Sequence, residues 1–136
     1  MKLADVRFSR QAGAVVAHLT GEIDMSNAQE LTEAVFGATG NHALGVVLDL
    51  TDVEYLDSAG IHLIYRLGDG LRVRGQRLAL VIPSTSPVND ALRLAGVRRD
   101  GNVFAALDPA LELMRRTDRA GSGERVGGRA GDDDQI

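Results

Sequence analysis

The chain has no cysteine and no excess of basic residues. The absence of cysteine excludes disulfides, catalytic thiolates and cysteine ligands for a metal. The 136 residues include 15 Lys and Arg against 19 Asp and Glu, for a formal net charge of -4. Binding to nucleic acid requires a clustered basic surface, so this balance argues against nucleic acid as a partner.

Long apolar runs are also missing. The longest, around residues 45–48 and 78–82, are far shorter than the roughly 20 residues that span a bilayer. A charged-then-apolar leader is absent too, because Asp5 follows the first apolar residues almost at once. From these absences we expect a cytoplasmic protein that has no membrane as a partner.

The motifs of metal sites, nucleotide sites and hydrolases are lacking as well. His18, His42 and His62 do not have the spacing of metal ligands, and neither glycine-rich nucleotide fingerprint occurs. Ser58 and His62 lie one helical turn apart, but residues 56–60 are not the Gly-x-Ser-x-Gly elbow of a serine hydrolase. We therefore predict no metal, no cofactor and no enzymatic activity. His18 falls within a strand pattern, and we expect it at the surface or on an edge strand.

Strand and helix patterns follow one another along the chain. Residues 3–9 and 14–19 predict two strands joined by a turn, which form an antiparallel hairpin. The apolar runs 45–50 and 77–82 flank a helical pattern, and a strand–helix–strand unit of this length implies a parallel pair. We also expect a helix that begins with a capping box at residues 26–29 and a short helix after Ser86. An edge strand at 102–104 and a helix from Asp108 follow. The sum is a small α/β domain with a mixed sheet of four or five strands and about four helices.

The chain has room for one domain with a proper core. From Asp118 onward, glycines and charged residues replace bulky apolar side chains. Such a segment cannot bury enough surface to offset its chain entropy. We therefore predict one domain over residues 1–117 and a disordered tail over residues 118–136.

Residues 46–64 are the most informative stretch. They begin as an apolar strand, pass through an acidic loop, and restart as an amphipathic helix at Asp57-Ser58. A serine at the start of a helix lies near backbone N–H groups that have no helical partner, and near the positive end of the helix dipole. Such a serine can be exposed, held still, and tolerate a phosphate.

The alternative is that Asp57 or Ser58 merely caps the helix. Two observations favour a switch at Ser58. Two adjacent capping-type side chains are present where one suffices, and the small residues Ala59 and Gly60 leave the hydroxyl uncovered. We therefore predict that Ser58 is exposed and can be modified.

Two motifs together resemble those of the anti-sigma factor antagonist family, the STAS-domain group of bacterial regulators. These are Asp-Ser-Ala-Gly at residues 57–60, after an apolar strand and an acidic loop, and Gly-Glu-Ile-Asp at residues 21–24. The order of strands and helices is similar over about residues 3–117. One departure is Ala59, because many members have Ser or Thr there, so a second acceptor is missing.

The resemblance implies a partner-switching function. Ser58 would be phosphorylated by an anti-sigma factor that is also a serine kinase. The unphosphorylated chain would bind that anti-sigma factor and free the sigma factor, and a serine phosphatase would reset the cycle. The resemblance and the motif positions give the expected partner surface as Asp24, Asp57, Ser58, Ala59 and Gly60.

The same fold also suits other functions, because a fold does not fix a function. The chain could be a STAS subunit of a stress-signalling scaffold or an accessory protein of a membrane transport complex. It could also be a structural adaptor in which Ser58 is never modified. Phosphate on Ser58 separates the adaptor from the others, and the identity of the partner separates the rest.

Overall fold

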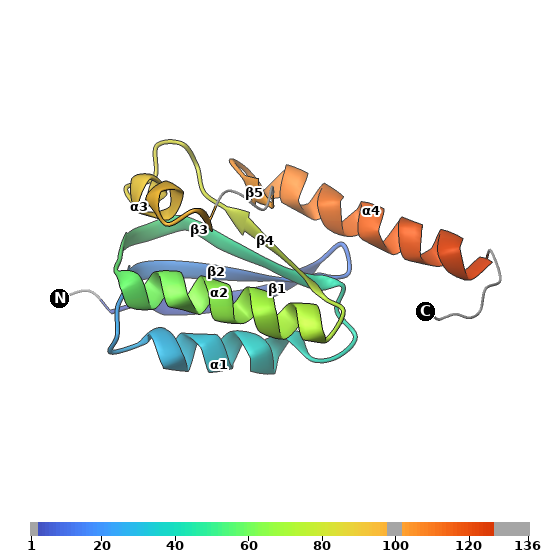
Figure 1. Cartoon of the computed structure of the whole chain (residues 1–136), viewed down its shortest axis with the longest axis horizontal. Helices are drawn as coiled ribbons and strands as arrows, with labels where there is room; N and C mark the ends of the chain where they lie inside the picture. The colour runs from blue at the N-terminus through green and yellow to red at the C-terminus, as the bar shows by residue number, and fades with distance from the viewer. Residues whose placement is uncertain (1–2, 98–101, 127–136) are drawn as a thin grey trace.

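The computed structural model describes residues 3–97 and 102–126, which form one five-stranded sheet and four helices (Figure 1). The elements in chain order are β1 (Asp5–Gln11), β2 (Ala14–Ile23), α1 (Ala28–Thr39), β3 (Gly45–Leu56), α2 (Ser58–Val73), β4 (Arg77–Val81), α3 (Asn89–Leu94), β5 (Val103–Phe104) and α4 (Leu107–Val126). The strands lie side by side in the order β1-β2-β3-β4-β5.

The sheet is mixed. β1 and β2 are antiparallel, which confirms the predicted hairpin. β2, β3, β4 and β5 are parallel neighbours, which confirms the parallel pair around α2 and the edge strand expected near residue 103. The predicted α/β fold, with a mixed sheet of four or five strands and about four helices, is therefore confirmed.

Helices cover both faces of the sheet. α1 and α2 lie together on one face, where Val46 and Leu48 of β3 join the larger apolar core (Figure 1). α4 lies on the other face, where Val47 shares a second apolar cluster with Leu111 and Met114. Successive strand residues point to opposite faces, so the start of β3 is apolar on both sides. This is the burial predicted for an almost wholly apolar strand.

The helix that follows β3 is amphipathic, as predicted. Residues three and four apart share one face of a helix, and the expected stripe along α2 is buried. Its members are Gly60, Leu63, Ile64, Leu67 and Leu71. Across residues 3–97 and 102–126, the helices are all too short or too polar to span a bilayer.

Two parallel strands are longer than predicted. β3 continues through residues 51–56, where we expected an acidic loop, and β2 continues through residues 21–23, where we expected a tight connection. These extensions pair with each other, from Thr20 opposite Asp52 to Ile23 opposite Leu56. Ladder pairing between neighbouring strands therefore overrides the low strand propensity of the charged residues.

The ends of these strands do not show a strand pattern in the sequence because the register between β2 and β3 is irregular. Leu50, Val53 and Leu56 are all buried in the same core, although they are three residues apart rather than two. A regular strand alternates with period two, so each interval needs one extra residue. The pairing of β2 with β3 has two such shifts, between His18 and Thr20 and between Gly21 and Glu22. The bulges hide the alternation that would have identified a strand.

The last helix also differs from the prediction. α4 begins at Leu107, close to the expected start, but runs to Val126. Residues 118–126, which we expected in a disordered tail, are therefore helical. Leu111 and Met114 anchor α4 on the sheet, and each further residue then adds one helical hydrogen bond. Residues 127–136 of the expected tail lie outside the described residues.

His18 is not on an edge strand, so that half of the prediction is wrong, but its side chain is partly exposed at the surface. It lies on β2, between β1 and β3. Its Nδ1 is 3.0 Å from Asp49 Oδ2, and its Nε2 is 2.9 Å from Asp52 Oδ2. The imidazole thus links β2 to two carboxylates on either side of a bulge in β3, and its side chain is 29% exposed. A strand pattern does not reveal such cross-strand partners.

Asp49 is the most strongly held of these acids. Its Oδ1 accepts hydrogen bonds from the Thr51 hydroxyl at 2.5 Å and the Thr51 N–H at 3.0 Å. Burial raises the pKa of Asp49, but the bonds from Thr51 and then the contact with His18 outweigh burial, so the pKa is lowered. The folded protein therefore favours the ionised form of the Asp49 carboxyl.

This lowered pKa predicts how stability depends on pH. A carboxyl whose pKa is depressed by folding stabilises the protein above its unfolded pKa of about 3.9, and this contribution is lost as pH falls through the folded value. We expect Asp49→Asn to lower the free energy of unfolding by about 1–2 kcal/mol at pH 7, and by less at low pH. Urea denaturation of both proteins between pH 3 and pH 7 measures the difference. A difference that stays constant over this range would contradict the prediction.

Candidate functional site

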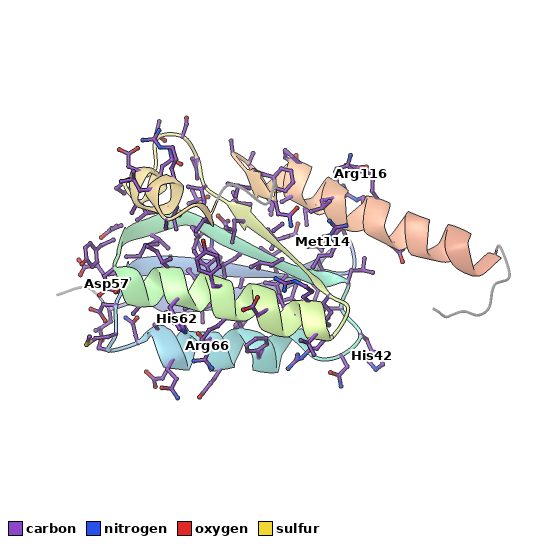
Figure 2. All side chains as sticks on the ribbon, in the orientation of Figure 1. His42, Asp57, His62, Arg66, Met114 and Arg116 are labelled. Atoms are coloured by element: carbon purple, nitrogen blue, oxygen red, sulfur yellow. The ribbon has the colours of Figure 1, made fainter. Side chains whose placement is uncertain are left out.

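Ser58 lies where β3 ends and α2 begins. It is the first residue of α2, and it is exposed. Asp57 precedes it as the N-cap in an extended conformation, and its Oδ1 accepts a hydrogen bond from the Ala59 N–H at 2.8 Å. Figure 2 shows Asp57 at this end of α2. The cap is thus Asp57, and within the described part of the chain the Ser58 hydroxyl has no hydrogen-bond partner.

The first turn of α2 packs against the ends of two strands. The Asp57 N–H donates to the Ile23 carbonyl at 3.3 Å, which joins the start of the helix to the end of β2. A Cβ added to Gly60 would lie 2.8 Å from Leu56 Cβ and 3.4 Å from Ile23 Cγ2. Only glycine lets the helix approach both strands this closely. Ala59 is partly buried beside the core.

Asp24 follows the end of β2 in a turn of its own. Its Oδ1 accepts the Ser26 hydroxyl at 2.5 Å and the Ser26 N–H at 2.9 Å. These two bonds, the hydroxyl first, hold the pKa of Asp24 below its usual value. The capping box predicted at residues 26–29 is therefore wrong. Asn27 takes the N-cap position without a side-chain capping bond, because its Oδ1 accepts from the Asp24 N–H at 3.1 Å and its Nδ2 donates to the Glu22 carbonyl at 2.9 Å.

The backbone requires a glycine at position 21, the first residue of the Gly-Glu-Ile-Asp motif. Its φ of +89° lies in the region that favours glycine, and an added Cβ would lie 2.4 Å from the Leu3 carbonyl oxygen. The chain before β1 thus passes directly over Gly21, at the second bulge between β2 and β3.

The pairing of the strands brings the predicted site residues together. Ile23 and Leu56 are the last partners of β2 and β3, so Asp24 and Asp57 leave the sheet from neighbouring positions. Glu22 and Glu54 lie on the ends of the same two strands. Together with Asp24 and Asp57, they give the carboxyl ends of β2 and β3 a negative charge. All five predicted residues of the partner surface therefore lie at one end of the molecule: Asp24, Asp57, Ser58, Ala59 and Gly60.

Sequence reasoning missed the apolar part of this end. Met25 and Tyr55 are 85% and 49% exposed, although both are large apolar side chains. A hollow of about 190 Å³ lies between the first turns of α1 and α2. It is lined by Met25, Ala28, Gln29, Thr32, Ala59, His62, Leu63 and Arg66. No sequence pattern separates an exposed methionine from a buried one.

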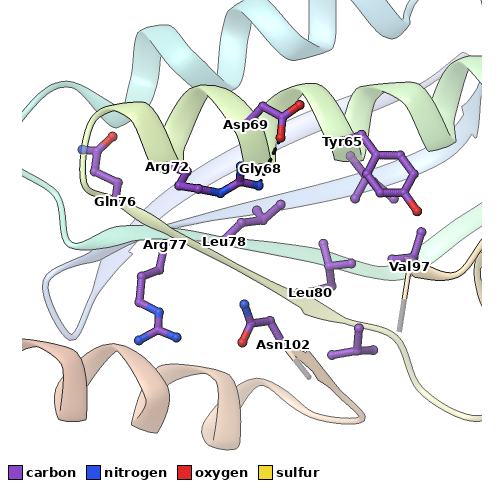
Figure 3. A pocket seen from close by; sticks show the side chains of 12 residues that line it. Tyr65, Gly68, Asp69, Arg72, Gln76, Arg77, Leu78, Leu80, Val97 and Asn102 are labelled. Atoms are coloured by element: carbon purple, nitrogen blue, oxygen red, sulfur yellow. Dashed lines mark hydrogen bonds and ion pairs between the residues drawn. The ribbon is translucent and has the colours of Figure 1, made fainter. Parts of the chain in front are cut away.

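A larger hollow lies away from Ser58. It has a volume of about 410 Å³, and later turns of α2, together with β4 and β5, line it (Figure 3). The ion pair between Asp69 and Arg72 spans 3.1 Å at its rim. The Gln76 Nε2 is bound to the carbonyls of Gly40 and Ala43 at 3.0 Å each. None of the predicted site residues contributes to this hollow.

The described contacts of Ser58 are not those of a hydrolase nucleophile. A serine nucleophile needs a base within hydrogen-bond reach, and the described contacts give Ser58 none, His62 included. Among the described residues, no three His, Cys, Asp or Glu side chains form a group that could hold a metal. What the arrangement offers is an exposed hydroxyl at the start of a helix, next to the capping carboxylate of Asp57.

Two glycines of α2 provide a matched test of this packing. We expect Gly60→Ala to lower the free energy of unfolding by about 1–3 kcal/mol, because the new methyl group overlaps Leu56. Gly68→Ala adds the same methyl group 3.7 Å from Leu78 Cδ2, an ordinary contact, and should raise stability by up to about 1 kcal/mol. Urea denaturation compares the two. Equal stability of the two variants would show that α2 does not depend on close approach at Gly60.

Comparison with known proteins agrees with this geometry. The model of the STAS domain family matches residues 5–110. The anti-sigma-F factor antagonist RsfB of Mycobacterium tuberculosis is 29% identical over 110 residues, which cover 79% of this chain and 88% of RsfB.

Solved structures share the fold. An anti-sigma factor antagonist from Mycobacterium paratuberculosis has a TM-score of 0.70 at 24% identity, over 83% of this chain and 95% of that one. The anti-sigma factor antagonist SpoIIAA in its unphosphorylated form has a TM-score of 0.54 at 18% identity, over 92% of this chain and 100% of that one. At these identities the likeness is one of fold, whereas the family model matches most of the sequence itself. The chain therefore belongs to the STAS domain family, as its two motifs implied.

Proposed function

We propose that the protein is an anti-sigma factor antagonist controlled by phosphorylation of Ser58. The unphosphorylated form binds an anti-sigma factor with serine kinase activity and frees the sigma factor. Phosphorylation of Ser58 ends that binding, and a serine phosphatase restores it. The exchange takes place in the bacterial cytoplasm, with no role for a membrane or a nucleic acid.

The observation that carries the proposal is the division between Asp57 and Ser58. Asp57 caps α2 through the Ala59 N–H at 2.8 Å, so the fold does not require the Ser58 hydroxyl. Ser58 is exposed, and the residues after it are small. A hydroxyl that is fixed in place, uncovered and not needed for folding is suited to modification by another protein. The relative RsfB, named as an anti-sigma-F factor antagonist, supports this reading.

The surface around Ser58 explains how a phosphate would change binding. Asp24, Asp57 and the neighbouring strand-end acids already make this end negative. A phosphoserine adds about -1.5 to -2 charges, which the helix N-terminus can accommodate. The partner, fitted to a neutral hydroxyl, must then desolvate a dianion or face like charge. A loss of about 3 kcal/mol is about a hundredfold in affinity, enough to exchange partners.

The chemistry of the switch belongs to the partners. This chain offers the acceptor hydroxyl, and the anti-sigma factor supplies ATP and the catalytic groups. Asp24, Ala59 and Gly60 contribute to the contact surface, together with the exposed side chains of Met25 and Tyr55. The neighbouring hollow between α1 and α2 can receive an apolar side chain of the anti-sigma factor.

The proposal predicts different binding by three forms of the chain. The unmodified protein and Ser58→Ala should both recover a small ATP-binding, kinase-like protein from host lysate. Ser58→Asp should lose it, with affinity for the purified partner reduced about a hundredfold. The thermal midpoint of Ser58→Asp should stay near that of the unmodified protein, because Ser58 is exposed and Asp57 holds the cap.

A matched control adds the same charge elsewhere. Ser9 is also exposed, but it lies on β1 opposite Val16, toward the other end of the sheet. Ser9→Asp should bind the partner as the unmodified protein does. If all forms recover the same partner, Ser58 is only the first residue of a helix, and a scaffold or transport role replaces the proposal.

A further inference from the structure

His62 lies one helical turn after Ser58 on α2. Residues four apart on a helix have Cβ atoms about 5–6 Å from each other. Helical side chains also lean toward the N-terminus, so the imidazole of His62 lies over the turn that Ser58 opens. Figure 2 shows His62 and Arg66 following Asp57 along the side of α2 that faces α1. Both residues are exposed, and both line the hollow between the two helices.

His62 and Arg66 lack the ion-pair partners that three other basic side chains on helices have. Arg72, Arg93 and Arg115 each form an ion pair with an acid three residues earlier on the same helix. Within residues 3–97 and 102–126, neither His62 nor Arg66 has such a pair. The side of α2 after Ser58 therefore carries two uncompensated basic groups, although the end of the molecule is acidic.

The groups that surround this position are few. Asp57 adjoins Ser58 and is committed to the Ala59 N–H. Asp24 is committed to Ser26. From α1, the uncharged Gln29 and Thr32 face the hollow, and Gln29 donates to Glu33 one turn further on at 3.3 Å. Among the residues that the structure describes, no carboxylate is paired with the imidazole of His62.

We infer that a phosphate on Ser58 is held by His62, so that the phosphorylated surface contains a pH-dependent charge pair. The inference rests on the proposed phosphorylation of Ser58 and names the residue that receives the phosphate. An acid that precedes a base by four residues is the favourable orientation on a helix. Arg66, one further turn along, adds a permanent positive charge to the same side of the helix.

The pair has a consequence for the switch. A positive charge on the imidazole favours the dianion of the phosphate, so the protonation of the two groups is coupled. While the imidazole is charged, it offsets part of the charge that the phosphate adds. The surface seen by the anti-sigma factor is then less negative in mildly acidic conditions than the phosphate alone would make it.

A titration of the phosphate tests the inference without any partner. Phosphoserine is installed at position 58 during translation, and its ³¹P resonance is followed from pH 4.5 to 8.5 in the full chain. We expect His62→Gln to raise the midpoint by about 0.2–0.4 pH units, the size of an i,i+4 ion pair on a helix surface. The sign follows because a nearby positive charge favours the dianion and so lowers its pKa. The difference should shrink in 0.5 M salt.

Two further variants make the result specific. His42 is exposed at the end of the molecule away from Asp57, and His42→Gln should leave the midpoint unchanged (Figure 2). His62→Arg keeps a positive charge and should keep the midpoint low. An identical midpoint in His62→Gln and the unmodified sequence would overturn the inference. Because no kinase or anti-sigma factor is present, that failure is distinct from a failure of the proposed switch, which the binding experiment decides.

Discussion

The structure depends on how closely the start of α2 approaches the paired ends of β2 and β3. Gly60 permits this approach, because any side chain there would overlap Leu56 and crowd Ile23. The approach holds Asp57 in position to cap α2 and leaves Ser58 facing outward. It also brings the turn of Asp24 beside the helix start, since Ile23 and Leu56 are strand partners. One packing constraint therefore arranges the whole candidate site.

The layers behind the site make this end rigid. The start of β3 is buried on both faces, by α1 and α2 on one side and by α4 on the other, and Leu50, Val53 and Leu56 continue the core under α1 and α2 as far as the site. His18 then links β2 to Asp49 and Asp52 across a bulge, where the sheet becomes polar. A phosphate added at Ser58 would thus meet a backbone that is fixed by apolar packing below and by hydrogen bonds around it. Its effect would fall on binding rather than on folding.

Most of the fold could be predicted from the sequence because the apolar patterns are regular where the core is regular. The runs at 45–50 and 77–82 and the stripe of α2 identify the central layers. The strand ends could not be predicted, because two bulges place Leu50, Val53 and Leu56 three residues apart. The partners of His18 and the exposure of Met25 depend on cross-strand register and on packing between helices, which no local pattern contains. The exposure of Ser58 could be predicted because its surroundings are local: a cap before it and small residues after it.

The capping of α2 by Asp57 has a consequence for how such a protein would store information. A side chain that the fold does not use can be altered at no conformational cost, so both states of Ser58 would share one backbone. The phosphorylated and unphosphorylated states would then differ in surface charge alone. The lifetime of the phosphorylated state would depend on the kinase and the phosphatase, and not on any conformational barrier within the protein.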